Sequence, residues 1–175
     1  MVAIFFYASK FLGEEEGSCC QLLDYWTNDF ISISPQLWTK SDKKAYNRGG
    51  LVYIRPCGWK RYALKVDGKY KDDTWLLGKG KRPDPFSSAQ EEWPVSYHGT
   101  SYNKGLSIAE EGYRLSQCKR FKHGIGIYST PDIDVAFKYA ETRQHSDGKT
   151  YKVVIQNRVN PKTLVKIDQS RNESR

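Results

Sequence analysis

Apolar and polar residues form the clearest strand patterns in the second half of the chain. Val95–His98 and Tyr151–Ile155 are rich in β-branched and aromatic residues, which predicts a strand at each place. Gly124–Ser129 is typical of a glycine hinge that leads into a further strand, and Thr163–Ile167 predicts another short strand. The tail from Asp168 is polar, so we expect it to be frayed.

Two helices are predicted between these strands. Tyr102–Glu111 carries apolar residues at helical spacing and is followed by Gly112, a residue typical of the position just after a helix. Pro131 predicts the start of a second helix, and Asp132 and Asp134 fall in its first turn, where the helix dipole favours acidic side chains.

The first half of the chain gives weaker signals. Ser18–Phe30 is compatible with a short helix, and Phe30–Ser34 alternates like a strand. Leu51–Ile54 predicts a short strand, and the stretch from Trp59 to Val66 alternates with the period of a half-buried strand. We expect its large first residue, Trp59, to lie in the core or in a contact between elements. Residues 78–92 predict a loop. The order of strands, helix, strand, helix and strands predicts an α+β fold with a bent, mostly antiparallel sheet.

Composition limits the kinds of protein to which the chain can belong. Its 175 residues fit one domain, or one domain with an extension, and a net charge of +8 with scattered basic residues is most simply a solvated surface. Vicinal cysteines followed by distant single ones, with three histidines, make a poor disulfide framework and a poor zinc site. The cysteines are Cys19, Cys20, Cys57 and Cys118. The apolar start Met1–Tyr7 is too short for a signal peptide or a membrane span, so we expect an intracellular protein, cytoplasmic or nuclear, without a membrane partner.

Four short segments stand at a characteristic spacing. They are Tyr97–Thr100 (Tyr-His-Gly-Thr), Gly112–Arg114 (Gly-Tyr-Arg), Gly124–Tyr128 (Gly-Ile-Gly-Ile-Tyr) and Tyr139, eleven residues after Tyr128. In this spacing and order, residues 93–167 resemble the PARP-like, diphtheria-toxin-type ADP-ribosyltransferase catalytic domain. The resemblance implies that fold, a split antiparallel sheet flanked by short helices. It does not extend to residues 1–92, which we expect to be an N-terminal extension with the first strands, packed on the core, and residues 168–175 are expected to be a polar tail.

The resemblance also implies roles for individual residues. His98 would hydrogen-bond the adenine-side ribose of NAD, and the backbone of Gly99 would hold the nicotinamide amide. Tyr128 and Tyr139 would enclose the nicotinamide ring, a planar contact suited to aromatic side chains. Arg114 would lie toward the adenosine end, and the basic loop 115–123 would cover the pyrophosphate. The implied NAD-binding set is His98, Gly99, Thr100, Arg114, Tyr128, Ser129 and Tyr139, and the implied catalytic set is His98, Tyr128 and Thr150.

The chain departs from the family pattern at two positions. Polymerising members have a Glu at the start of the last core strand, and counting back from Tyr151 places Thr150 there. Gln156, six residues further on, shares the strand face with Thr150 but lies roughly 20 Å away. A Ser that contacts the nicotinamide amide in the family is Ala136 here, so one cofactor hydrogen bond worth about 0.5–1.5 kcal/mol is missing.

Because family members without that Glu are mono-transferases or inactive, the resemblance implies that Thr150 disfavours chain elongation, and Thr150 and Ala136 together favour a module without turnover, whereas His98 and Tyr128 argue for transfer. The expected activity is therefore mono-ADP-ribosyl transfer from NAD to a protein acceptor, or to a nucleic acid, with release of nicotinamide and without a metal. A second hypothesis is a module of the same fold that binds NAD or ADP-ribose, or docks RNA or protein, without turnover. A third is an RNA 2′-phosphotransferase that uses Arg114, Lys119, Arg120 and Lys122.

Overall fold

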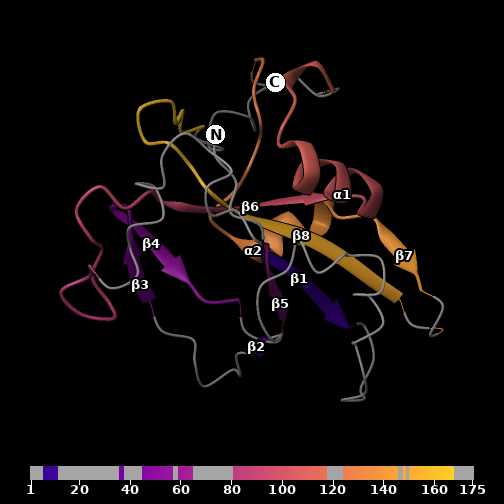
Figure 1. The fold of residues 1–175 in the computed structure, drawn as a ribbon, viewed down its shortest axis with the longest axis horizontal. Helices are drawn as coiled ribbons and strands as arrows, with labels where there is room; N and C mark the ends of the chain where they lie inside the picture. Colours follow the sequence, from indigo (N-terminus) through magenta and orange to yellow (C-terminus); the bar gives the residue numbers. More distant parts are fainter. Residues whose placement is uncertain are drawn as a thin grey trace, which may run out of the picture.

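The computed structural model describes residues 6–11, 36–37, 45–56, 59–64, 81–117, 124–145, 148 and 150–167. Within these ranges the chain forms a six-stranded sheet, a two-stranded sheet and two α-helices (Figure 1). All strand pairs in both sheets are antiparallel. The described part of the chain is therefore α+β, as the order of the predicted elements indicates.

The large sheet contains strands from both halves of the chain. It is built from β1 (Phe6–Phe11), β2 (Gln36–Leu37), β5 (Lys60–Ala63), β6 (Val95–Thr100), β7 (Thr142–Gln144) and β8 (Thr150–Arg158). The strand order is β2-β5-β1-β8-β6, and β7 pairs with the first residues of β8. Strand β1 thus lies directly between β5 and β8, so strands from residues 1–92 and 93–167 share one sheet.

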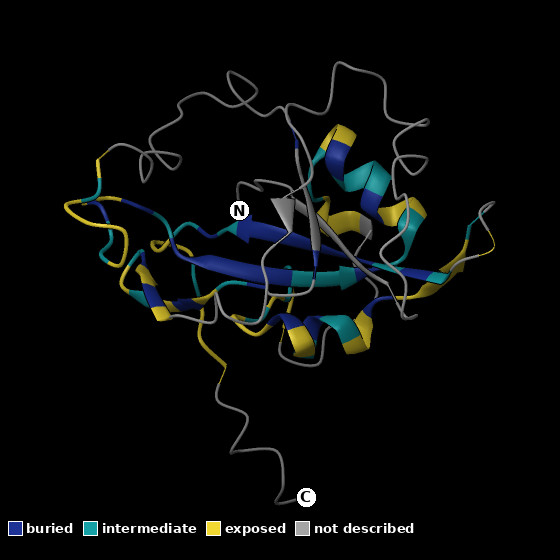
Figure 2. Cartoon of the chain, turned by 90° about the horizontal axis from the view of Figure 1, so that it is seen from below, coloured by how far each residue is buried: buried dark blue, intermediate teal, exposed yellow. Residues whose placement is uncertain are grey.

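Strand β8 is buried on both of its faces. Val153–Asn157 are buried without interruption, whereas a strand with one solvated face would alternate between buried and exposed residues. Figure 2 shows the reason, because α1 (Tyr102–Glu111) lies on one side of the sheet and α2 (Ile133–Tyr139) on the other.

Helix α1 has the predicted bounds, and Gly112 ends it. Gly105 and Ala109 are its buried residues and face the sheet. Gly112 has φ 80°, a conformation that favours glycine, and its N–H donates to the carbonyl of Ile108 at 2.8 Å. The chain can therefore leave the helix abruptly after Glu111 and turn back toward the sheet.

Helix α2 begins two residues after Pro131. Asp132 lies before the first turn and caps the helix, because its side-chain Oδ1 accepts from the N–H of Asp134 at 2.8 Å. Asp134 lies in the first turn, as predicted, and Ile133 and Ala136 face the core.

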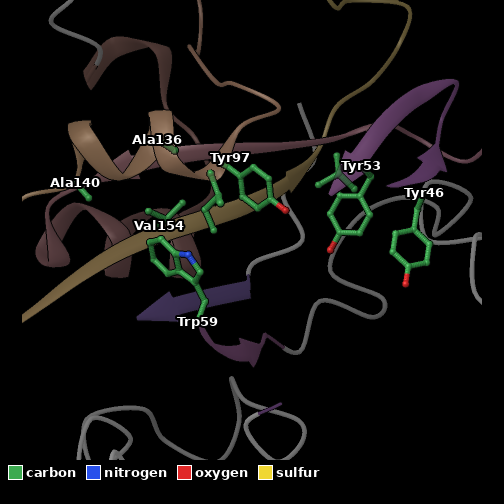
Figure 3. Close-up of a cluster of buried hydrophobic side chains, with 9 residues drawn as sticks. Tyr46, Tyr53, Trp59, Tyr97, Ala136, Ala140 and Val154 are labelled. Atoms are coloured by element: carbon green, nitrogen blue, oxygen red, sulfur yellow. The ribbon is translucent and has the colours of Figure 1, made fainter. Parts of the chain in front are cut away.

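The described hydrophobic core includes a cluster between the large sheet and α2 (Figure 3). Trp59, Tyr97 and Val154 are almost completely buried, with 2%, 1% and 0% of their surface exposed. The Trp59 ring meets Phe137 of α2 edge to face, with ring centroids 5.6 Å apart. The prediction that Trp59 is a core residue is confirmed.

A small hairpin extends this core. Strand β3 (Ala45–Arg48) pairs with β4 (Leu51–Ile54) through the turn at Gly49 and Gly50, which have φ 62° and 77°. Its alternate residues Tyr46 and Tyr53 point into the core, as Figure 3 shows.

A buried ionic cluster fastens the hairpin to the large sheet. The carboxylate of Glu92 is fully buried. It accepts a hydrogen bond from Arg82 Nε at 2.9 Å and forms an ion pair with Arg158 at 2.9 Å, and Arg48 Nε lies 3.9 Å away. Burial raises the pKa of Glu92, but the hydrogen bonds from Arg82 and the charge of Arg158 outweigh it and lower the pKa to about 2. One carboxylate therefore links the 81–92 loop to β3 and β8.

Two predicted strands do not form. Among the described residues, 124–129 form no strand: Gly124 makes a single bridge contact, and Thr130 joins the sheet through an isolated bridge to Tyr97. Residues 163–167 follow a turn in which the N–H of Thr163 donates to the Asn160 carbonyl, and they form no strand. Neither segment can pair with β8, because β8 is already paired with β1 on one side and with β6 and β7 on the other. The elements predicted at 18–30 and 30–34 lie outside the described residues, as do the four cysteines.

Candidate functional site

The edge of β6 that faces away from β8 is only partly occupied. The N–H of Tyr97 donates to the carbonyl of Thr130 at 2.7 Å, and the N–H of Thr130 donates to the carbonyl of Tyr97 at 3.0 Å. Backbone groups of alternate residues in a strand point to the same edge, so the N–H and C=O of Gly99 also point there. No described residue hydrogen-bonds to either group. Within the part of the chain that the structure describes, Gly99 thus presents one donor and one acceptor side by side at an unpaired edge.

Gly99 is required because α2 packs directly on it. A Cβ atom at this position would lie 1.9 Å from the carbonyl oxygen of Ala136 and 2.9 Å from the amide nitrogen of Ala140. The helix could not approach β6 so closely with any other residue at position 99. Tyr139, which lies between these two residues at the end of α2, has 61% of its surface exposed.

His98 precedes Gly99 in β6, and its imidazole ring is hydrogen-bonded to the backbone of Tyr128. Its Nδ1 is 2.8 Å from the carbonyl oxygen of Tyr128, and a carbonyl can only accept, so Nδ1 carries a proton. Burial lowers the pKa of His98, the Tyr128 carbonyl raises it, and Lys104 lowers it, with a net lowering. The ring is therefore neutral near pH 7, and Nε2 is left as a hydrogen-bond acceptor.

Tyr128 fixes its own loop. Its hydroxyl donates to the carbonyl of Gly124, four residues earlier, and its carbonyl accepts from His98. These two hydrogen bonds fix residues 124–128, which do not form the predicted strand.

The structure does not bring Thr150 to His98. His98 pairs directly with Ile155, so residues 151, 153, 155 and 157 of β8 share its face of the sheet. Thr150 and Gln156 lie on the opposite face, and Thr150 pairs with Gln144 of β7. Gln156 is buried and its Oε1 has no hydrogen-bond partner. His98 and Tyr128 are thus assembled together, but Thr150 is not.

The other predicted binding residues have varied surroundings. Arg114 is exposed and forms an ion pair with Glu111 at 3.3 Å. Ser129 is exposed, and Thr100 is buried with its carbonyl accepting from the N–H of Glu141 at 3.3 Å. Leu115–Gln117 form a short 3-10 helix, and residues 118–123 of the basic loop lie outside the described part.

Comparison of the chain with family models, with curated proteins and with solved structures gave no match. Among the described helices, neither has the length and apolar character needed to cross a bilayer. No three His, Cys, Asp or Glu side chains of the described ranges are grouped closely enough to hold a metal ion.

Sequence reasoning missed three residues beside His98. Tyr113 meets the His98 ring edge-on, with centroids 5.4 Å apart and planes at 90°, and its hydroxyl donates to Asn157 Oδ1 at 2.9 Å. Asn157 is fully buried in β8, and the buried Ser96 lies directly opposite it on β6. The one available signal was an amide side chain at the end of an otherwise apolar strand run, which predicts a buried polar contact.

Proposed function

We propose that the chain is an NAD-dependent mono-ADP-ribosyltransferase that moves one ADP-ribosyl group from NAD to a protein acceptor, or to a nucleic acid, and releases nicotinamide. The observation that carries the proposal is the open backbone pair of Gly99 beside His98. The carboxamide of nicotinamide has one acceptor oxygen and an NH₂ donor. It matches the N–H and C=O of Gly99 in the way that a further strand would.

His98 supplies the second part of the proposed site. With Nδ1 bonded to the Tyr128 carbonyl, Nε2 accepts a hydrogen bond from a ribose hydroxyl. The exposed ring of Tyr139, on the helix turn that packs on Gly99, provides an apolar surface for the nicotinamide ring.

The reaction needs orientation and charge stabilisation. Nicotinamide in NAD is a cationic substituent on an anomeric carbon, so its departure passes through an oxocarbenium-like state, as in glycoside cleavage. Holding the carboxamide at two points fixes the leaving group while the bond to the ribose breaks. The net charge of +8 favours the approach of the anionic pyrophosphate.

A second candidate is a module that binds NAD or ADP-ribose without transfer. It is favoured by the register of β8, which puts Thr150 on the face opposite His98 and leaves the expected third catalytic position without that side chain. The two candidates share the same binding site and differ only in turnover.

Incubation with labelled NAD separates them. We expect the wild type to release nicotinamide and to gain the mass of one ADP-ribosyl group, and His98→Ala to lose both. His145→Ala is the matched control. His145 follows β7, its ring contacts the ring of Tyr151 in β8, and it takes no part in the proposed site.

The other outcomes are equally informative. A rise in melting temperature with NAD, but without nicotinamide release, would favour the binding module. Absence of both binding and release in the wild type would refute the NAD site itself.

A further inference from the structure

The face of the sheet that carries His98 also carries a cluster of buried polar side chains. Ser96 and Asn157 have 7% and 0% of their surface exposed and lie directly opposite each other on β6 and β8. Ser96 Oγ and Asn157 Nδ2 have no hydrogen-bond partner. A buried amide with an unpaired nitrogen costs free energy, so packing alone does not explain an Asn at position 157. The one side-chain hydrogen bond that Asn157 makes within the described part of the chain is to Tyr113.

Tyr113 reaches this face because of the way α1 ends. Gly112 adopts φ 80° and turns the chain back over the sheet immediately after the helix. The next residue, Tyr113, then touches two strands at once. Its ring meets His98 of β6 and its hydroxyl meets Asn157 of β8.

We propose that Tyr113, anchored by Asn157, is a positioning residue that sets the orientation of the His98 imidazole. The ring of His98 is then fixed by the Tyr128 carbonyl at Nδ1 and by the edge-on Tyr113 ring. Rotation about the ring's attachment is restricted from both directions, so Nε2 keeps a single direction. This inference rests on the proposed function only for the identity of the ligand that Nε2 meets.

Tyr113→Phe tests the proposal because it retains the ring and removes only the hydroxyl that bonds Asn157. Tyr102→Phe is the matched control, since Tyr102 of α1 packs against the guanidinium of Arg143 and contacts neither His98 nor Asn157. The first readout is the ¹⁵N spectrum of the His98 side chain without NAD, which reports the tautomer and the pKa. The second is the affinity for NAD.

We expect Tyr113→Phe to change the His98 tautomer ratio and pKa and to weaken NAD binding about two- to tenfold, the range for loss of one hydrogen bond. Tyr102→Phe leaves both unchanged. Asn157→Leu is expected to add little when combined with Tyr113→Phe, because both break the same link.

The results also separate this inference from the proposed function. If His98 in Tyr113→Phe is indistinguishable from the wild type in its ¹⁵N signals, the positioning role is refuted. If those signals change although the wild type does not bind NAD, the positioning role stands and the proposed ligand is wrong.

Discussion

Replacing Glu92 by Gln tests the buried ionic cluster that joins the hairpin to the sheet. Glutamine keeps the size of the side chain and one acceptor oxygen, but it removes the charge that Arg48, Arg82 and Arg158 share. The three guanidinium groups then remain largely buried without the counter-charge of Glu92. Breaking an ion pair is most destabilising when the remaining charge is buried.

The size of the effect follows from the pKa. Glu92 is lowered from 4.5 to about 2, and at about 1.4 kcal/mol per pH unit this corresponds to roughly 3 kcal/mol of stability at pH 7. The Glu92 side chain is 0% exposed, but 22% of the Arg82 side chain is exposed and solvent screens that partner, so roughly 3 kcal/mol is an upper bound. In a chain of 175 residues this corresponds to a fall in melting temperature of about 6–12 °C.

The sign of the pH dependence is also determined. A carboxyl group whose pKa is depressed on folding stabilises the fold fully above its unfolded pKa of 4.5 and loses this contribution as the pH falls toward about 2. The difference in unfolding free energy between wild type and Glu92→Gln should therefore be largest at pH 7 and shrink between pH 4.5 and 2.

Urea unfolding followed by tryptophan fluorescence measures both effects, because Trp59 is buried in the core. Glu91→Gln is the matched control, since Glu91 is the exposed neighbour in the same loop. A loss below about 1 kcal/mol at pH 7, or a difference that does not change with pH, would refute this account of the cluster.

Two further predictions concern the site. Gly99→Ala should destabilise the protein by about 1–3 kcal/mol or more, since its methyl group would overlap the Ala136 carbonyl. Urea unfolding measures the loss against Gly126→Ala, where an added Cβ would meet no atom within 4 Å. The pKa of His98 lies below its usual 6.5, and protonation of the ring removes the Nε2 acceptor, so affinity for NAD should fall as the pH drops below 6.5. Calorimetric titration at several pH values measures this affinity. Affinity that does not vary with pH would contradict the role of Nε2.

Elements whose signals are local could be predicted from the sequence. The bounds of α1 were predicted correctly because a helical pattern from Tyr102 is ended by Gly112, whose φ of 80° is a property of one residue. The core of β8 was predicted because β-branched residues suit a buried strand whatever its neighbours are. The position of Trp59 in the core followed from its size and its strand pattern.

Elements that depend on a distant partner could not be predicted. Residues 163–167 have a strand pattern but pair with no strand, while the less apolar Ala45–Arg48 forms β3 because β4 lies beside it. The segment before Thr130 is held by His98 and by the Tyr128 hydroxyl in place of a ladder. In each case the outcome depends on whether another segment offers a partner, which the apolar pattern of the residues themselves does not specify.

The site divides in the same way. The sequence by itself indicated a strand that ends at His98 and set the distances along the chain to Tyr128 and Tyr139. The structure extends that strand, β6, through Gly99 to Thr100. Only the tertiary structure decided that the backbone of Gly99 faces an open edge, that Tyr113 and Asn157 join His98, and that Thr150 lies on the opposite face. The reason is the register of β6 against β8, since a shift of one residue exchanges the two faces of a strand and no local signal near Thr150 specifies it.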